Sequence, residues 1–467
     1  MTAIINYHLQ KCLILQLFLC KNAYIYKFSK MKRSKLADLM AWKNSDSRKP
    51  LILRGARQVG KTWLMKEFGQ TQYAQTVYLN FEKNKRLKAL FSDDFDIKRV
   101  IVALQAESGL TIKPENTLLI FDEIQAVPEA ITALKYFQED ANEYHVIAAG
   151  SLLGVALHSG ISFPVGKVIF MDLYPLTFLE FLDAIGESAI SQILQSGDWK
   201  LINVYKSKYI ERLRQYYYVG GMPEAVLKFS KNQSFTEVRE IQKQILEAYD
   251  QDFSKHAPIE IVPRIRMVWN SIPAQLAKEN RKFIYGLIKE GFRARDYEIA
   301  LSWLIDCGQV YKVCRVKKTG FPLKAYEGIS AFKIFLVDVG LLAAMGDIDA
   351  KTLLEGNAKF SEFKGSLTEQ YVFQQLAVNK DLVVYYWSAE RSTAVVDFTI
   401  QHNGLVFPLE VKAEENLRAK SLREYHEKFS PPVSIRTSMS DFRKQERLTN
   451  LPLYAISELT EHVTRNA

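Results

Sequence analysis

The stretch Gly55-Ala-Arg-Gln-Val-Gly-Lys-Thr62 constrains this chain more than any other feature. It matches the pattern G-x-x-x-x-G-K-[S/T] in full, and it lies between an apolar stretch at 51–54 and a stretch of helical spacing at 63–68. Glycines at these positions let backbone N–H groups turn inward and hold phosphate oxygens at the amino end of a helix. The motif therefore predicts a strand, a phosphate-binding loop and a helix in direct succession.

The chemistry of this loop predicts ATP and Mg²⁺ as ligands. Lys61 is expected to reach the β- and γ-phosphates, and the Thr62 hydroxyl to ligate Mg²⁺. The residues expected to contact the nucleotide are Gly55, Ala56, Arg57, Gln58, Val59, Gly60, Lys61, Thr62 and Trp63.

An acidic pair follows the loop by 60 residues, where the apolar stretch Leu118-Leu-Ile-Phe121 ends in Asp122-Glu123. We expect Asp122 to hold Mg²⁺ and Glu123 to orient or deprotonate the attacking water, because phosphoryl transfer depends on positioning and charge neutralisation. Ser151 is the candidate sensor of the γ-phosphate, or else a serine that caps a helix.

Two further polar residues are candidates for the nucleotide site. Gln125 follows the acidic pair closely, and Lys167 lies in the loop beyond Ser151. Lys167 is either a cationic finger directed at the phosphates or a solvated loop lysine.

Apolar stretches at 51–54, 77–81, 118–121 and 145–149 alternate with stretches of helical spacing. This alternation predicts an α/β fold with a parallel sheet. Beyond Pro175 helical periodicity continues to about residue 262, and the aromatic cluster 216–218 is expected to be core. Residues 263–345 then show two helical stretches and a strand pair, the outline of a winged helix.

The last part of the chain combines carboxylates and a lysine on two expected strands, 395–400 and 405–412, joined by Asn403-Gly404. Side chains alternate along a strand, so Glu410 and Lys412 share a face and the hairpin brings Asp397 beside them. Glu369, on the preceding helix, could add a carboxylate. Such a group could hold Mg²⁺ and cleave a phosphodiester with Asp397, Glu410 and Lys412, or it could be an ion pair of an edge hairpin.

Charge and cysteine content set limits on the class of protein. The chain of 467 residues has a formal charge of +10, but seven basic residues and no acidic one lie in the first 35, which leaves +3 on the rest. This balance is weak evidence for nucleic acid. The four cysteines form no C-x-x-C pair, so a disulfide framework or zinc site is not indicated and a reducing cytoplasm fits best. No apolar stretch is long enough to span a membrane.

With these residues in view, the chain resembles a family of bacterial and archaeal AAA-type ATPases that carry a C-terminal domain of unknown function 4143. The resemblance runs from about Met31 to Leu459. The stretches that carry it are 50–62, 121–125, 150–154, 163–167, 174–178, 220–225, 332–342, 365–369 and 408–412.

The resemblance implies an AAA-like ATPase core, a winged-helix segment and a C-terminal domain similar to nucleases with a PD-(D/E)xK core. Where the family often reads Glu-Val-Asp-Phe, this chain has Val395-Val-Asp-Phe398, so one acidic residue of the family pattern is missing. The expected segments are an ill-ordered or upstream-translated extension at 1–30, an ATPase core at 31–175, a helical region at 176–262, a winged-helix-like segment at 263–345 and a nuclease-like domain at 346–467.

Three functions follow from these readings. The first is ATP hydrolysis coupled to nucleic-acid handling, with DNA as partner. The second is a nucleotide-gated switch whose C-terminal domain binds a protein partner and cleaves nothing. In the third, residues 263–345 are a packing module only; their basic residues are then a solvated face.

Overall fold

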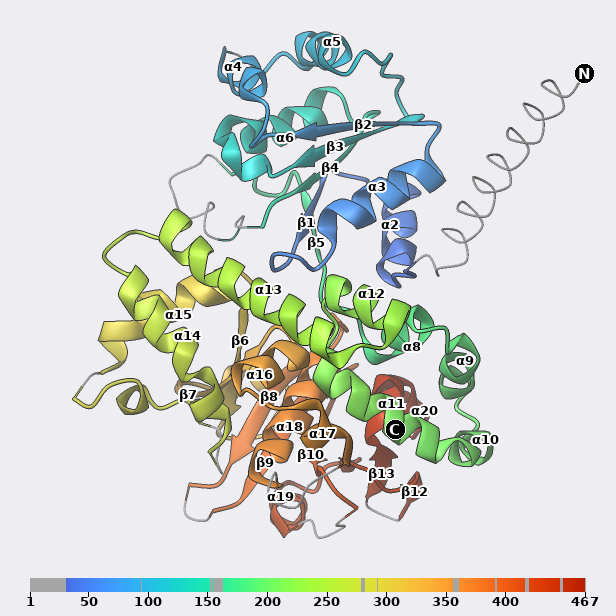
Figure 1. Ribbon diagram of the computed structural model, residues 1–467, viewed down its shortest axis with the longest axis vertical. Helices are drawn as coiled ribbons and strands as arrows, with labels where there is room; N and C mark the ends of the chain where they lie inside the picture. The colour runs from blue at the N-terminus through green and yellow to red at the C-terminus, as the bar shows by residue number, and fades with distance from the viewer. Residues whose placement is uncertain are drawn as a thin grey trace, which may run out of the picture.

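The computed structural model contains two β-sheets, with a group of helices between them (Figure 1). The residues described are 31–93, 95–151, 154, 163–278, 282–291, 293–355, 361–390, 393–415, 420–445 and 448–466. The extension expected at 1–30 lies outside the described residues. In this described part of the chain, no helix is both long and apolar enough to cross a membrane.

The N-terminal sheet has five parallel strands in the order β2-β3-β4-β1-β5. The central strands β3 and β4 are buried along their whole length, as expected for a parallel sheet covered on both faces. The strands are β1 Leu51–Arg54, β2 Gln75–Asn80, β3 Thr117–Asp122, β4 His145–Ala149 and β5 Ile169–Asp172.

Alternate residues of these strands enter two separate cores. Leu118 and Ile120 pack in the core shared with the rest of the protein, whereas Leu119 and Phe121 pack in a core local to the N-terminal part. This is the two-residue period of strand side chains. The helices around the sheet are α2 Lys35–Lys43, α3 Lys61–Gln72, α4 Lys85–Asp93, α5 Ile97–Ser108, the short η1 Ile124–Ala126 and α6 Pro128–Asp140.

A helical region connects the two sheets. Helix α11 ends at Gly220, whose φ of +72° and close approach to Asp338 leave no room for a Cβ. Helix α12 begins at Pro223, the usual place of a proline in a helix. The side chains of Tyr216, Tyr217 and Tyr218 are buried, which confirms that this cluster is core. The helices are α8 Phe178–Ala184, α9 Ser188–Ser196, α10 Trp199–Val204, α11 Lys206–Val219, α12 Pro223–Asn232 and α13 Phe235–His256.

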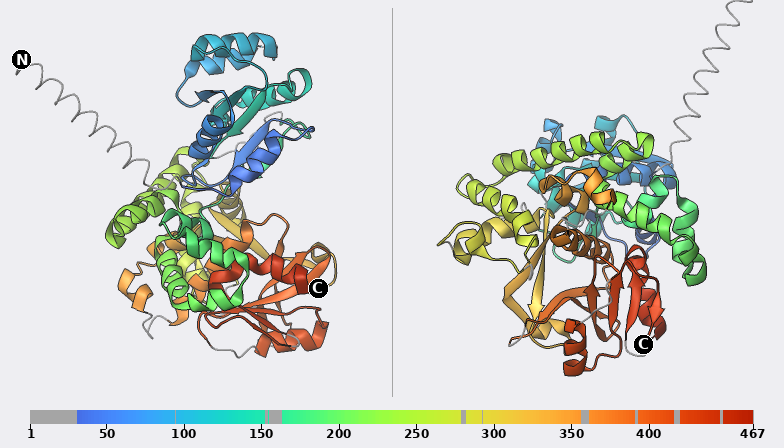
Figure 2. Two further views of the ribbon diagram at one scale, coloured as in Figure 1. Left: turned by 90° about the vertical axis from the view of Figure 1, so that its right-hand side faces the viewer. Right: turned by 60° about the horizontal axis from the view of Figure 1, so that its bottom comes forward.

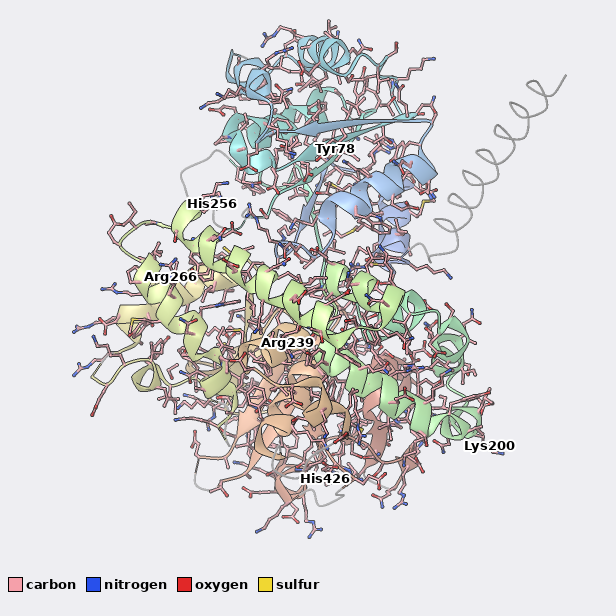
Figure 3. All side chains as sticks on the ribbon, viewed as in Figure 1. Tyr78, Lys200, Arg239, His256, Arg266 and His426 are labelled. Carbon is pink, nitrogen blue, oxygen red and sulfur yellow. The ribbon has the colours of Figure 1, made fainter. Side chains whose placement is uncertain are left out.

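Helix α13, with 22 residues, runs between the two sheets (Figure 1 and the left view of Figure 2). Its carboxyl end, which carries His256, points toward the N-terminal sheet (Figure 3). There Lys255 forms an ion pair of 2.9 Å with Glu82, beyond the end of β2.

The second sheet is mixed and has eight strands in the order β12-β13-β11-β10-β9-β8-β6-β7. The turn Asn403-Gly404, with φ of +46° and +80°, joins β9 to β10 as the sequence predicts. The strands are β6 Val310–Val316, β7 Glu327–Leu336, β8 Val383–Ser388, β9 Val395–His402, β10 Leu405–Val411, β11 Ile435–Ser438, β12 Arg443–Lys444 and β13 Thr449–Pro452.

The strand pair β6–β7 departs from the expected segment boundaries. The sequence places this pair in a winged-helix-like segment that ends at residue 345, but β6 pairs in parallel with β8 and continues the C-terminal sheet. The edge of β6 is thus covered by β8, so the pair is not a free wing. The remaining helices are α14 Val262–Leu276, α15 Ala294–Asp306, α16 Val339–Met345, α17 Ala350–Glu355, α18 Ser361–Ala377, α19 Lys420–Phe429 and α20 Leu459–Asn466, and four short 3₁₀ segments complete the described elements: η1 above, η2 Tyr285–Leu287, η3 Leu323–Tyr326 and η5 Leu453–Glu458.

Candidate functional site

The glycine-rich loop connects the carboxyl end of β1 to the amino end of α3, as the motif demands. Gly55, Gln58 and Gly60 have positive φ values of +147°, +64° and +94°. A Cβ on Gly55 would lie 2.2 Å from the carbonyl oxygen of Leu173, so only glycine fits there. The backbone N–H groups at the start of α3 therefore form an anion site of the kind that holds phosphates.

Lys61 is buried and folded back onto its own loop. Its Nζ donates hydrogen bonds to the carbonyl oxygens of Gly55 (2.7 Å) and Ala56 (2.8 Å). Burial lowers the pKa of Lys61 to about 8, and the carboxylates of Glu123 and Asp122 oppose this shift. To reach a phosphate, this ammonium has to exchange two carbonyl oxygens for phosphate oxygens.

Asp122, at the carboxyl end of β3, lies against the start of α3. The hydroxyls of Thr62 and Tyr78 each donate to Asp122 Oδ2 at 2.8 Å. A hydroxyl and a carboxylate side by side are oxygen ligands that suit Mg²⁺, so this pair fits the cation that the motif implies. Sequence reasoning did not find Tyr78, which lies on β2 (Figure 3); burial raises its pKa to about 12.

Glu123 is hydrogen-bonded to two of the polar residues that are expected near the γ-phosphate. Its Oε2 accepts hydrogen bonds from the Ser151 hydroxyl (3.2 Å) and from Gln125 Nε2 (2.6 Å). Three candidate residues from the ends of β3 and β4 are therefore in contact. Trp63, by contrast, is 38% exposed on α3.

Arg57 links the phosphate loop to the helical region. Its Nε donates to the Ser151 hydroxyl at 3.3 Å, and its guanidinium forms an ion pair with Asp252 of α13. The Tyr249 hydroxyl, one turn earlier on α13, donates to the Arg57 carbonyl oxygen at 2.8 Å. Burial raises the pKa of Asp252, and Arg57 opposes this. Sequence reasoning missed both α13 residues.

A second segment reaches the loop from the end of α15. A cavity of about 330 Å³ lies between them, lined among others by Gly55, Ser151, Asp306 and Gly308. Gly308 has φ of +69°, and a Cβ there would lie 3.2 Å from the backbone nitrogen of Ala56. The phosphate loop is thus in close contact with residues some 250 positions further along the chain.

Lys167 does not belong to this site within the chain. Ile169 aligns with Leu51, the first residue of β1, whereas the phosphate loop follows Arg54 at the other end of that strand. Lys167 therefore lies at the opposite edge of the sheet, where its Nζ is 2.8 Å from Glu139 Oε1 on α6. Of the two expectations for Lys167, a cationic finger or a loop lysine at the surface, this position agrees with the second.

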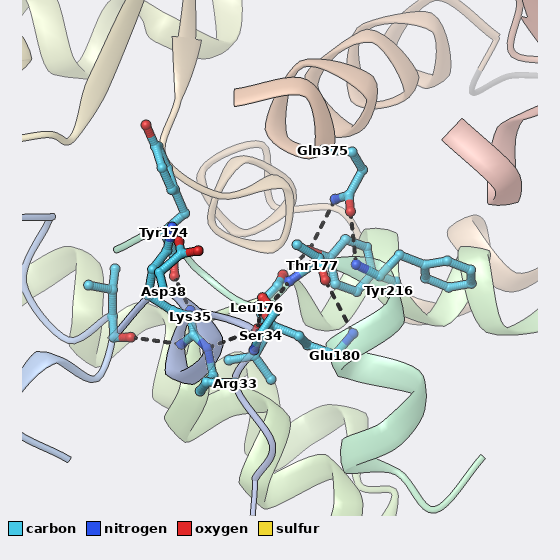
Figure 4. Close-up of polar contacts among 12 residues, drawn as sticks. Arg33, Ser34, Lys35, Asp38, Tyr174, Leu176, Thr177, Glu180, Tyr216 and Gln375 are labelled. Carbon is cyan, nitrogen blue, oxygen red and sulfur yellow. Dashed lines mark hydrogen bonds and ion pairs between the residues drawn. The ribbon is translucent and has the colours of Figure 1, made fainter. Parts of the chain in front are cut away.

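Arg33 anchors the back of the loop to the helical region (Figure 4). Its guanidinium donates to the carbonyl oxygens of Val59 (3.1 Å) and Tyr174 (2.6 Å) and to Glu180 Oε1 (3.3 Å). The side chains of Arg33 and Glu180 are only 4% and 8% exposed.

The same figure shows how the contacts continue toward the C-terminal part. Gln375 of α18 accepts a hydrogen bond of 2.9 Å from the backbone of Phe178, at the start of α8. The Tyr216 hydroxyl donates to the Leu176 carbonyl oxygen and accepts from Gln374 Nε2 at 3.0 Å. Polar contacts thus connect the phosphate loop to α18.

The C-terminal hairpin places its polar residues as the strand period predicts. Lys412 Nζ is 2.7 Å from Glu410 Oε1, and Asp397 Oδ2 accepts from the Val411 backbone at 2.8 Å. The pKa of Glu410 is raised, as expected for paired carboxylates, but burial is the main cause and Asp397 a smaller one.

Glu369 meets this group through a residue that sequence reasoning missed. Lys333 of β7 has its Nζ 2.6 Å from Glu369 Oε1 and 3.8 Å from Asp397 Oδ1. Within the described ranges, no three carboxylate, imidazole or thiol groups are placed so that they could hold a metal ion. The expected ligand set of Asp397, Glu410 and Glu369 therefore does not fit a metal in this arrangement.

Basic residues surround α15 and the end of β6. Arg293, Arg295, Lys312, Lys317 and Lys318 are exposed. Arg315 is partly buried and donates to the Ser388 carbonyl oxygen at 2.7 Å. On α15 itself, Ile299 is 65% exposed, whereas Tyr297, Trp303 and Leu304 are buried.

Comparison with known families gives three matches. Residues 47–182 match the family described as AAA domain, and residues 364–456 match domain of unknown function 4143. Residues 210–352 match domain of unknown function 8612. No curated protein matches the sequence.

Several solved structures are similar to this chain at low identity. The Walker-type ATPase paby2304 of Pyrococcus abyssi is 14% identical, with 68% of this chain and 96% of that chain covered and a TM-score of 0.43. The RuvB Holliday junction branch migration motor of Thermotoga maritima is 14% identical, with coverage of 59% and 87% and a TM-score of 0.27. Cdc6p from Pyrobaculum aerophilum is 13% identical, with coverage of 70% and 96% and a TM-score of 0.25.

Proposed function

Since the chain belongs to the AAA-type P-loop ATPases that carry a C-terminal domain of unknown function 4143, we propose that it binds and hydrolyses Mg-ATP at the loop of residues 55–62. The observation that supports this most is the contact between Thr62, at the end of the loop, and the Asp122 carboxylate. It joins the two elements that ATP hydrolysis requires, a phosphate site and an acidic strand end.

Each polar residue of the site has a role in this proposal. Lys61 binds the β- and γ-phosphates, and the loop N–H groups hold their remaining oxygens. Glu123 accepts a proton from the attacking water or orients it, while Ser151 and Gln125 hold the Glu123 carboxylate in place. Thr62 and Asp122 would hold Mg²⁺, which when bound neutralises charge on the phosphates.

ATP turnover by the purified full chain tests the proposal. Lys61→Ala should lose nucleotide binding, because it removes the only side-chain cation of the loop's GKT end. Glu123→Gln should bind ATP and lose turnover, because the carboxylate acts on water and not on the ground-state nucleotide. Glu139→Gln, at the opposite edge of the sheet, is the matched control and should hydrolyse ATP at the wild-type rate. Wild-type turnover by Glu123→Gln would contradict the assigned role.

The nucleotide state is, in this proposal, transmitted through α13 to the C-terminal sheet. Arg57, inside the loop, is held by Asp252 and Tyr249 of α13, so a phosphate that moves the loop also changes these contacts. The helix can carry such a change because it packs against α12, α14 and α16.

Two aspartates of α13 permit a controlled test. Asp252→Asn removes the charge that holds Arg57, whereas Asp250→Asn removes an equivalent charge that pairs with Arg266 at 2.8 Å. With Glu123→Gln as background, ATP should slow hydrogen exchange in α14 and α15. We expect Asp252→Asn to abolish this effect and Asp250→Asn to retain it. The same response in both variants would exclude α13 as the connection.

Duplex DNA is the partner that the exposed basic residues around α15 favour. If these side chains contact phosphates, affinity will fall steeply with salt, because bound counterions are released. Titration of labelled duplex at two salt concentrations tests this. No binding even at low salt would leave a protein partner as the alternative.

The C-terminal sheet takes part by binding and not by cleavage in this proposal. Its carboxylates are already paired with Lys333 and Lys412. Plasmid and single-stranded DNA incubated with Mn²⁺ should stay intact with the wild type and with Lys412→Ala. Cleavage that the wild type performs and Lys412→Ala does not would restore a phosphodiesterase role.

A further inference from the structure

Lys333 is an ionic residue in the interior of the C-terminal sheet. It lies in the middle of the apolar stretch Phe332-Lys-Ile-Phe-Leu336 on β7, and its side chain is 1% exposed. A lysine is seldom buried to this extent unless its charge is paired. Its partner is Glu369 of α18, which is fully buried, at 2.6 Å, and Asp397 of β9 lies 3.8 Å away on another element.

The other carboxylate of this group also faces cations. Glu410 contacts Lys412 at 2.7 Å, and Arg436 is its neighbour on the adjacent strand β11, where the two Cα atoms are register partners. Arg436 is buried as well and acts electrostatically on Glu410. Among the residues that the structure describes, the three carboxylates Glu369, Asp397 and Glu410 thus lie beside three cations, Lys333, Lys412 and Arg436.

This arrangement differs from a magnesium or manganese site in one respect. Such a cation needs several carboxylate or water oxygens to converge at about 2.1 Å around one point. Here the point between Glu369 and Asp397 is held by an ammonium. We infer that the Lys333 ammonium takes the place of the divalent cation in this group, so that the C-terminal site binds no metal while Lys333 is present.

Charge balance gives the physical reason. A group with no net charge gains little from a divalent ion, and adding two charges to a buried, neutral group is costly. Removing Lys333 reverses the situation, because two carboxylates are then left near each other with one cation fewer. A divalent ion would relieve their repulsion.

A titration of the nucleotide-free full chain with Mn²⁺ tests the inference. The bound ion is measured as the loss of the electron paramagnetic resonance signal of free Mn²⁺. Wild type and Asp397→Asn should give the same titration, since neither binds the ion in the C-terminal sheet. Lys333→Met keeps most of the stem and removes the charge; it should bind one additional Mn²⁺. The double variant Lys333→Met/Asp397→Asn should lose it again. Ions bound at Thr62 and Asp122 contribute equally to all four proteins.

Thermal unfolding supplies a second readout. Mn²⁺ should raise the melting temperature of Lys333→Met and leave that of the wild type unchanged, because a ligand stabilises only the state that binds it. The inference is overturned if the wild type binds an ion that Asp397→Asn does not, or if folded Lys333→Met gains none. Should Lys333→Met fail to fold, the comparison of wild type with Asp397→Asn decides.

Discussion

Replacing Glu180 with glutamine should destabilise the protein by about 3 kcal/mol, because it leaves the buried guanidinium of Arg33 without a carboxylate. Glu180 Oε1 accepts from Arg33 Nε (3.3 Å) and from the backbone and hydroxyl of Ser34, both at 2.8 Å. Its Oε2 accepts from the Thr177 backbone at 3.0 Å, where a glutamine NH₂ would oppose a second donor. The Arg33 guanidinium and the Thr177 backbone N–H therefore both lose the carboxylate that they contact.

A double-mutant cycle separates this pair from its surroundings. Arg33→Met should also cost about 3 kcal/mol, and the double variant should cost less than the sum of the two by about 1–3 kcal/mol, because the partners are in contact. The matched control is Lys35→Met, which breaks an ion pair of 2.7 Å with Asp38, a half-exposed residue. That change should cost less than about 1 kcal/mol.

Urea unfolding, followed through tryptophan fluorescence, measures each free energy of unfolding. The reasoning fails if Glu180→Gln unfolds at the same urea concentration as Lys35→Met, or if the single costs simply add. Either result would mean that Arg33 and Glu180 have no measurable interaction energy, although both side chains are buried.

Three further outcomes follow from the geometry. ATP affinity should fall as pH rises above about 8, up to tenfold per pH unit, because Lys61 then loses its proton in the free protein while phosphate binding requires it; calorimetric titration at pH 7.5, 8.5 and 9.5 measures this. Gly109 and Gly308 share a φ of +69°, but only a Cβ at position 308 would lie against the phosphate loop. In chemical denaturation, Gly109→Ala should lower the free energy of unfolding by about 1 kcal/mol and Gly308→Ala by more than that. Only Gly308→Ala should also weaken ATP binding. Tyr216→Phe should cost about 1–3 kcal/mol because it breaks hydrogen bonds in the interior, whereas Tyr454→Phe, whose buried hydroxyl has no hydrogen-bond partner among the described residues, should change stability by less than about 0.5 kcal/mol.

The nucleotide site was largely predictable because its signals are local. The glycines of 55–62 fix the loop, and a buried apolar stretch before Asp122 fixes the strand that delivers the carboxylate. The edge strand β5, by contrast, has only four residues, which alternate neither in polarity nor in burial, so no local pattern predicts it. Ser151 lies beside Glu123 because parallel strands end at the same edge of the sheet.

The contacts missed are those between distant segments. Arg57 and Asp252 are 195 positions apart, and neither periodicity nor composition connects them. Lys333 had a readable signal, since a lysine inside an apolar stretch needs a buried partner, although only the fold identifies Glu369. The pairing of β6 with β8 is likewise nonlocal, which explains why the strand pair was assigned to a separate segment.

The pairing of β6 with β8 has a consequence for how this chain can be divided. The matches to known families end at residue 352 and resume at 364, yet the sheet extends across both. A fragment that begins near 364 would leave β8 with an unpaired edge, open to pairing with other chains, and would contain Glu369 without Lys333. During synthesis, β6 and β7 leave the ribosome before the strand that covers them, so the sheet is completed only when the last quarter of the chain is made. A recombination event that transfers residues 210–352 or residues 364–456 to another protein would therefore have to transfer both segments together.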